Sequence, residues 1–209
     1  MARPILTMTI LTLAAAGLAA CANDNPFRIT RSACPAVAIP AYTGEMTLFT
    51  RPASDAASDI DIVAAITNVR GGCTEAAETL ITDASFEVQA RRTDAGPARQ
   101  VTLPWFAAVV QAGDRLVTKQ MGQVTLNFAA GQERASTTAT ARSEVARSVA
   151  TLPATLNERL NRQRKTGDVD AALDPLADPE VRALVREHSF EVLIGFQLQD
   201  DQLAFNVSK

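Results

Sequence analysis

The stretch FEVLIGFQL, residues 190–198, shows the clearest structural pattern in this chain of 209 residues. Its large apolar side chains recur at every second position, which is the period of a β-strand. They are Phe190, Val192, Ile194, Phe196 and Leu198. Because one entire face of the stretch is apolar, we expect a strand in the centre of a sheet.

Weaker stretches of the same alternation precede it. In residues 84–91, for example, Phe86 and Val88 alternate with Glu87 and Gln89. Further candidate strands are 46–49, 59–69, 100–110, 116–128 and 137–146, with a turn expected at 70–73 and a loop at 91–99. About seven short strands predict a mainly β fold. We expect an antiparallel β-sandwich of immunoglobulin-like or fibronectin-like topology, and a small barrel is the alternative.

Helical signals replace this alternation between residues 152 and 187. Leu152, Leu156 and Leu160 recur every four residues and form a narrow apolar stripe. The triplet DPE at 178–180 supplies an N-cap, a proline at the first helical position and an acid in the first turn. The sequence therefore predicts a helical insertion within the β domain.

Composition limits the classes of function. Apolar residues make up 47% of the chain and aromatic residues only 5%, so we expect a core built mainly from Val, Ile, Leu and Ala. The formal net charge is −3, which argues against a general nucleic-acid surface. We therefore expect no nucleic-acid partner.

The N-terminus has the organisation of an export signal. Arg3 supplies a positive charge, and Ile5–Leu18 is an uncharged apolar run. At about 14 residues the run is shorter than the roughly 20 that a spanning helix needs, and it matches the apolar part of a signal peptide. It ends in LAAC, residues 18–21.

LAAC after such a run resembles the lipobox of bacterial lipoproteins. The resemblance implies that residues 1–20 are a signal peptide and that the Cys21 thiol receives a diacylglyceryl group. The polar segment 21–33 would then be a lipidated tether. It would hold a single domain, residues 34–209, with the helical insertion at 152–187. Acyl chains hold such a domain at a membrane because each buried methylene contributes about 0.8 kcal/mol.

Several segments together resemble a group of small, uncharacterised envelope lipoproteins of alphaproteobacteria. They are ACPAVAI (33–39), VRGGC (69–73), VTLPWFAAV (101–109) and FEVLIGFQLQDDQLAFN (190–206). The resemblance implies a lipid-anchored envelope protein and supplies no catalytic residues. Ala22, not aspartate, follows Cys21. By similarity to enterobacterial sorting rules, this favours the periplasmic face of the outer membrane.

Two further cysteines, Cys34 and Cys73, predict a disulfide. An even pair in an exported chain is expected to oxidise, and closing a loop of about 40 residues would stabilise the fold by about 4 kcal/mol. A zinc site is the alternative. It lacks ligands, because His188 is the only histidine and tetrahedral zinc takes four. We expect neither a metal nor a cofactor.

Pro104, Trp105 and Phe106 are a candidate partner surface. Proline cannot donate a ladder hydrogen bond, so Pro104 predicts an edge strand, a bulge or a bend. Exposed aromatic side chains on an edge can mark an interaction surface. Packing of both rings in the core is the alternative.

Four basic residues, Arg159, Arg162, Arg164 and Lys165, are a candidate site for membrane or anion contact. Near a lipid anchor each could contribute about 1 kcal/mol by attracting anionic headgroups. The alternative is stabilisation of the helix dipole at the C-terminus of the predicted helix.

The remaining titratable residues favour structural roles. His188 could act as a general base, but its place after a helix favours contact with the last carbonyls. Asp55, Asp59 and Asp61 lack the glycine and the distal glutamate of an EF-hand loop and favour a solvated loop. We assign no catalytic residue.

The sequence predicts a non-enzymatic interaction or accessory module whose partner is an envelope protein. The alternative is a lipoprotein that binds a small apolar ligand or a glycan between the sheet and the helical insertion. A hydrolase ranks third and would require a polar cleft around His188.

Overall fold

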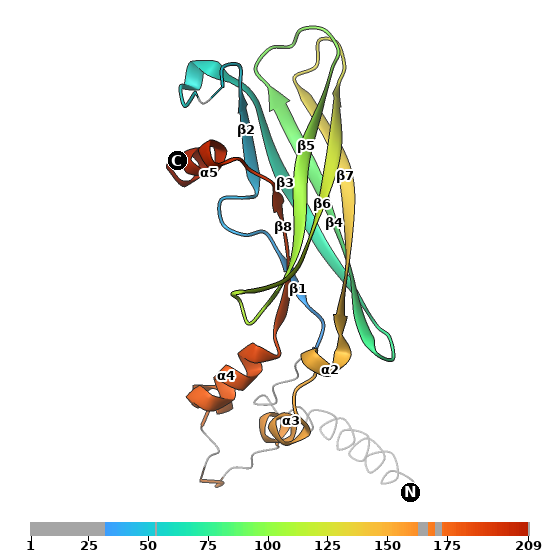
Figure 1. Ribbon diagram of the computed structural model, residues 1–209, viewed down its shortest axis with the longest axis vertical. Coiled ribbons are helices and arrows are strands. Elements are labelled where there is room, and N and C mark those ends of the chain that lie inside the picture. Colours follow the sequence, from blue (N-terminus) through green and yellow to red (C-terminus); the bar gives the residue numbers. More distant parts are fainter. Residues whose placement is uncertain (1–31, 53, 163–166, 170–172, 209) are drawn as a thin grey trace, which may run out of the picture.

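The fold comes from a computed structural model that describes residues 32–52, 54–162, 167–169 and 173–208. Two four-stranded sheets pack face to face, and helices lie beyond one end of them (Figure 1). The expected mainly β sandwich is confirmed. The immunoglobulin-like or fibronectin-like topology stays a prediction. Within these described ranges, no helix is long and apolar enough to cross a membrane.

Sheet I has the strand order β1-β8-β5-β6. Its strands are β1 (Ala36–Ala38), β8 (Phe190–Phe196), β5 (Arg99–Gln111) and β6 (Arg115–Phe128). The strand predicted from the FEVLIGFQL stretch is β8, and it lies between β1 and β5 as expected for a central strand. Sheet I is not purely antiparallel, because β1 runs parallel to β8 with Val37 opposite Val192.

Sheet II has the strand order β2-β3-β4-β7. Its strands are β2 (Glu45–Phe49), β3 (Ile60–Glu75), β4 (Thr79–Arg92) and β7 (Arg134–Ala146). All three pairings in this sheet are antiparallel. Its strands include the predicted alternating stretch 84–91, which lies within β4.

The turn expected at Arg70–Cys73 is wrong, because these residues continue β3 and pair with β4. The irregularity lies just before them, as a register shift between Thr67 and Arg70. Gly71 allows a close approach of β1. A Cβ atom on Gly71 would lie only 2.4 Å from Cγ2 of Val37, so the side chain of β1 occupies that space.

The chain crosses between the sheets directly after β1. Thr43 accepts a hydrogen bond from Phe196 N of sheet I at 2.8 Å, and the next residue, Gly44, accepts one from Ile66 N of sheet II at 2.8 Å. Residues 39–44 therefore close one side of the sandwich.

Side chains from both sheets interdigitate in the core. The rings of Phe86 on β4 and Trp105 on β5 meet edge to face, with centroids 5.2 Å apart. Gly122 on β6 lies opposite Trp105, and a Cβ there would come within 2.1 Å of the indole. The core contains the inward residues of β8: Phe190, Val192, Ile194 and Phe196.

The helical insertion is confirmed and lies beyond one end of the sandwich, here called the helical end (Figure 1). It comprises α3 (Ala154–Asn161), the 3₁₀ turn η3 (Pro175–Ala177) and α4 (Pro179–Glu187), preceded by α2 (Arg147–Ala150). The predicted cap holds, since Asp178 Oδ1 accepts from Glu180 N at 2.9 Å. Leu156, Leu160 and Val181 form a small core of their own.

Besides β1 and α2, two elements outside the predicted insertion at 152–187 were not predicted. One is the 3₁₀ turn η2 (Ala57–Asp59) before β3, and the other is α5 (Asp200–Ser208) after β8. Helix α5 packs against β2 through the rings of Phe205 and Phe49, whose centroids are 5.1 Å apart. Asn206 Nδ2 donates to the carbonyls of Tyr42 and Glu45, both at 2.8 Å.

Candidate functional site

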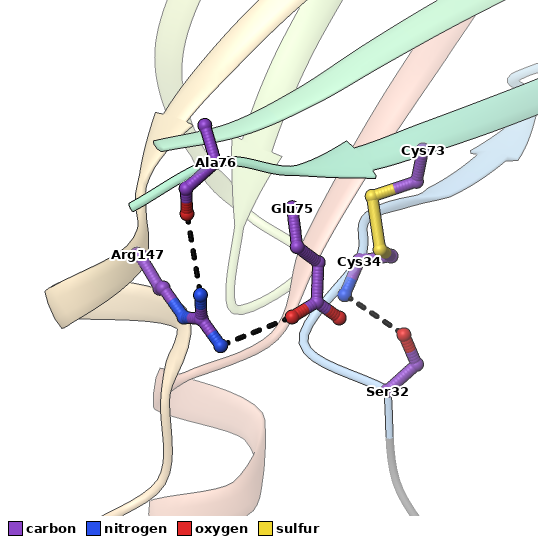
Figure 2. The surroundings of a disulfide bond; sticks show 6 residues. All are labelled: Ser32, Cys34, Cys73, Glu75, Ala76 and Arg147. Carbon is purple, nitrogen blue, oxygen red and sulfur yellow. Dashed lines mark hydrogen bonds and ion pairs between the residues drawn. A yellow bond between two sulfur atoms is a disulfide. The ribbon is translucent and has the colours of Figure 1, made fainter. Parts of the chain in front are cut away.

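A disulfide joins Cys34 and Cys73, as predicted, with Cα atoms 6.1 Å apart (Figure 2). Cys34 lies two residues before β1, and Cys73 lies near the end of β3. The N-terminal segment is therefore bonded to sheet II and then pairs with sheet I. Cys21 lies outside the described residues.

Polar contacts surround the disulfide at the helical end (Figure 2). Arg147 Nη2 donates to Glu75 Oε2 at 3.1 Å, and Arg147 Nη1 donates to the carbonyl of Ala76 at 3.2 Å. Cys34 N donates to Ser32 Oγ at 3.1 Å. Both charged side chains are nearly half exposed, so their ion pair contributes little and the covalent bond is the main link.

The edge predicted at Pro104 is wrong, because β5 has β8 on one side and β6 on the other. The missing N–H is tolerated because β8 ends at this point. Trp105 is the last β5 residue in register with β8, opposite Phe196. Beyond Trp105, Gln197 N donates to the Pro104 carbonyl at 3.0 Å. Because the register between β5 and β8 ends at Trp105, the ladder does not require an N–H from Pro104.

The two aromatic residues after Pro104 point to opposite faces of sheet I. Trp105 is only 7% exposed and packs in the core, as the alternative predicted. Phe106 is half-buried on the outer face, where Lys119 Nζ lies 4.7 Å from its ring centroid. Met121 lies opposite Phe106 and is exposed. We call Pro104, Phe106 and Met121 the sheet I surface.

Of the four basic candidates at the helical end, Arg159 is held in an ion pair. Arg159 Nη2 lies 2.7 Å from Asp178 Oδ2. This guanidinium, helped by the backbone N–H of Glu180, lowers the pKa of Asp178 below its usual 3.8. Arg162 is the C-cap of α3. Arg164 and Lys165 lie outside the described residues.

His188 has a structural contact. It is the C-cap of α4, and its Nδ1 lies 2.8 Å from the carbonyl of Val149 in α2. The imidazole therefore joins α4 to α2 at the helical end. This matches the predicted contact of His188 with carbonyl groups, although the carbonyl belongs to a different helix.

Two of the three aspartates in the 55–61 region are held by arginines. Asp59 is buried, and the Ser54 hydroxyl, followed by the Arg51 guanidinium, lowers its pKa below the usual 3.8. Asp61 accepts from both Nη atoms of Arg99 at 2.7 and 2.6 Å, which raises the pKa of Arg99. Among the residues described, no three His, Cys, Asp or Glu side chains gather to hold a metal ion.

A buried arginine that sequence reasoning missed organises the opposite end of the sandwich, here called the loop end. Arg92 is only 3% exposed. Its guanidinium donates to four backbone carbonyls at 2.7–3.0 Å, from the β4–β5 and β6–β7 loops. These acceptors are Gly96, Pro97, Ala129 and Gln132. The sequence signal for its burial was its position, because Arg92 continues the alternation of buried side chains along β4.

The described residues form, among other surface features, two hollows of different size. One of about 800 Å³ lies over sheet II, beneath the η2 turn. Apolar Ala57, Ile60, Val63 and Ala65 line it together with polar Glu87, Gln89, Arg91, Arg134 and Ser136. The other measures about 130 Å³, lies at the helical end and includes Leu152 and Asn157. The larger hollow is therefore remote from the helical insertion.

No protein family, curated protein or solved structure matches this chain significantly.

Proposed function

We propose that this protein is a lipid-anchored lipoprotein of the bacterial envelope, attached through Cys21 and acting as a non-enzymatic interaction or accessory module. The observation that carries the proposal is the Cys34–Cys73 disulfide. Structural disulfides persist in exported proteins, and this one fixes the chain where the segment after LAAC reaches the sandwich. The periplasmic face of the outer membrane is the proposed location.

Replacement of the acceptor cysteine tests the anchor. In the Cys21→Ser variant, labelled palmitate should no longer be incorporated, and the protein should leave the membrane fraction. Ala22→Ser is the matched control and should keep both properties. Equal membrane association of the native and Cys21→Ser proteins, with no palmitate in either, would refute the anchor.

The sheet I surface is the proposed contact for an envelope partner. Half-buried Phe106 and exposed Met121 present apolar area on the outer face of sheet I, whereas Glu87, Gln89 and Arg91 of β4 lie on the outer face of sheet II. Apolar patches with polar rims are typical of interaction sites. A photo-crosslinker at Met121 should capture one defined protein in cells. The same group at Thr138, exposed on β7, should not; equal capture from both positions argues against this surface.

The hollow over sheet II favours a second candidate function, binding of a small apolar ligand or a glycan. Its volume of about 800 Å³ lies in the range of ligand sites, and apolar and polar groups both line it. Calorimetry with a medium-chain fatty acid and with an oligosaccharide panel tests this function. Val63→Trp, which fills the hollow, should abolish binding that the distant Met121→Trp leaves intact.

A further inference from the structure

The C-terminal segment 203–207 has the pattern of a strand, although it lies in α5. Leu203, Phe205 and Val207 alternate with Ala204 and Asn206, and this period of two is typical of a half-buried strand. Phe, Val and Asn are weak helix formers, and so short a helix gains little stability by itself. The helical state of this segment therefore depends on its contacts.

The contacts between α5 and β2 leave apolar side chains exposed and polar atoms unpaired. Leu203 and Val207 remain 40% and 56% exposed, so Phe205 supplies most of the apolar contact. In the part of the chain that the structure describes, Asn206 Oδ1 and Thr47 Oγ1 on the neighbouring β2 are buried without a hydrogen-bond partner. Buried polar atoms of this kind destabilise the state that contains them.

The outer edge of β8 is the place where a strand following β8 would pair. It is covered by the short β1, with Val37 opposite Val192, and by Thr43. Phe196 N donates to the Thr43 carbonyl at 2.8 Å, so the backbone of Phe196 faces this edge. Because strand residues alternate in direction, the backbones of Ile194 and Val192 face it too.

A hairpin would bring the C-terminal segment to the same edge in a register that buries its apolar side chains. A loop at 198–201 sets Leu203 opposite Phe196 and Val207 opposite Val192. Phe196 and Val192 point into the core. Directly opposed residues share a face, so the alternating apolar residues of the segment would point into the core as well.

We propose that the outer edge of β8 is a strand-binding site with two competing occupants from this same chain, β1 and the segment 203–207. The Cys34–Cys73 disulfide gives β1 the advantage, because it fixes the chain two residues before β1 begins. When β1 leaves the edge, the segment 203–207 detaches from β2. It then pairs with β8 as an antiparallel strand.

Residue-resolved amide hydrogen exchange of the full chain distinguishes the two states. In the native protein, consecutive amides from Leu203 onward should be protected, since Leu203 N already donates to the Gln199 carbonyl at 2.9 Å. When the segment 203–207 is paired with β8, only alternate amides face β8. Exchange should then be about tenfold slower at the amides of Leu203, Phe205 and Val207 than at those of Ala204 and Asn206.

Two independent variants release β1. Cys34→Ser with Cys73→Ser removes the covalent link, and Ala38→Pro keeps the disulfide but removes an amide from β1. Alternating protection in either variant supports the proposal. Consecutive helical protection, or no protection at all, in both variants overturns it. Alternation that appears only at high protein concentration also overturns it, because the strand would then come from a second copy.

A matched pair of substitutions identifies the face of the new strand. Val207→Glu and Ala204→Glu both alter exposed positions of α5, so both should leave the native state intact. In the released variants, Val207→Glu should abolish the alternation because position 207 faces the core. Ala204→Glu should preserve it. Equal responses to both substitutions would refute the proposed register.

Discussion

The two ends of the sandwich are closed by different chemistry. At the loop end, the buried Arg92 guanidinium binds carbonyls of two loops and needs no covalent bond. At the helical end, the Cys34–Cys73 disulfide is accompanied by the half-exposed ion pair of Arg147 and Glu75. The contacts that close the loop end therefore form on folding alone, whereas the disulfide at the helical end also requires oxidising conditions.

Loss of the disulfide should have the largest effect. Cys34→Ser with Cys73→Ser should lower the free energy of unfolding by about 4 kcal/mol, because a loop of about 40 residues regains its freedom in the unfolded chain. Urea denaturation measures this change. Dithiothreitol should destabilise the native protein by a similar amount and leave the double variant unchanged. A native protein that is indifferent to reductant contradicts this view of the helical end.

Arg92→Met should destabilise the loop end by about 3 kcal/mol, because four loop carbonyls lose the charged donor that the buried guanidinium supplies. The neighbouring Arg91→Met is the matched control. Arg91 is exposed and pairs only loosely with Glu133, at 3.4 Å, so its loss should be about 0.5 kcal/mol. Similar midpoints of urea denaturation for the two variants would show that Arg92 does not organise this end.

Leu160→Ala should destabilise the helical end locally, by about 2 kcal/mol, because Leu160 is buried in the small core with Leu156 and Val181. Amide exchange should accelerate in α3 and α4 and stay unchanged in β4 and β8. Leu184→Ala, at a partly exposed position of α4, should have little effect. Acceleration throughout the sandwich would instead show that the two regions unfold together.

Acid should have the smallest effect, and it should act at both ends. The lowered pKa values of Asp59 and Asp178 mean that each carboxylate stabilises the fold above about pH 3.8. This stabilisation should be lost as the pH falls below that value. Asp59→Asn at the loop end and Asp178→Asn at the helical end should each reduce the dependence of stability on pH between 7 and 3. An unchanged dependence in both variants would contradict these assignments.

Local patterns predicted the elements that they specify directly. Alternation identified β4 and β8, and the DPE triplet placed the start of α4, because a strand face and a helix cap depend on adjacent residues. The same reasoning failed at Gly71, where the neighbour that requires a glycine is Val37, far away in sequence. It also failed at Pro104, for which an edge strand was one of three predictions, beside a bulge and a bend, although β5 is a central strand. Alternation reports which face is buried and not which strands are neighbours.

Prediction of the candidate sites also succeeded or failed according to whether their partners could be recognised in the sequence. The disulfide followed from the expected export and the even cysteine count, whereas Trp105 was predicted either on a partner surface or in the core, and the structure places it in the core. Arg92 was missed because its partners are carbonyls of two loops, which have no sequence signature. The segment 203–207 was missed as a helix because its alternation favours a strand. The contacts of Phe205 and Asn206 with β2 outweigh that local preference.

The disulfide also determines how the domain resists mechanical tension on its N-terminus. A pull on the segment before Cys34 passes through sulfur to Cys73 and loads β3 along its own length. The long antiparallel ladder with β4 then shares the force in shear. Without the bond, the same pull would act first on β1, which pairs with β8 over only three residues.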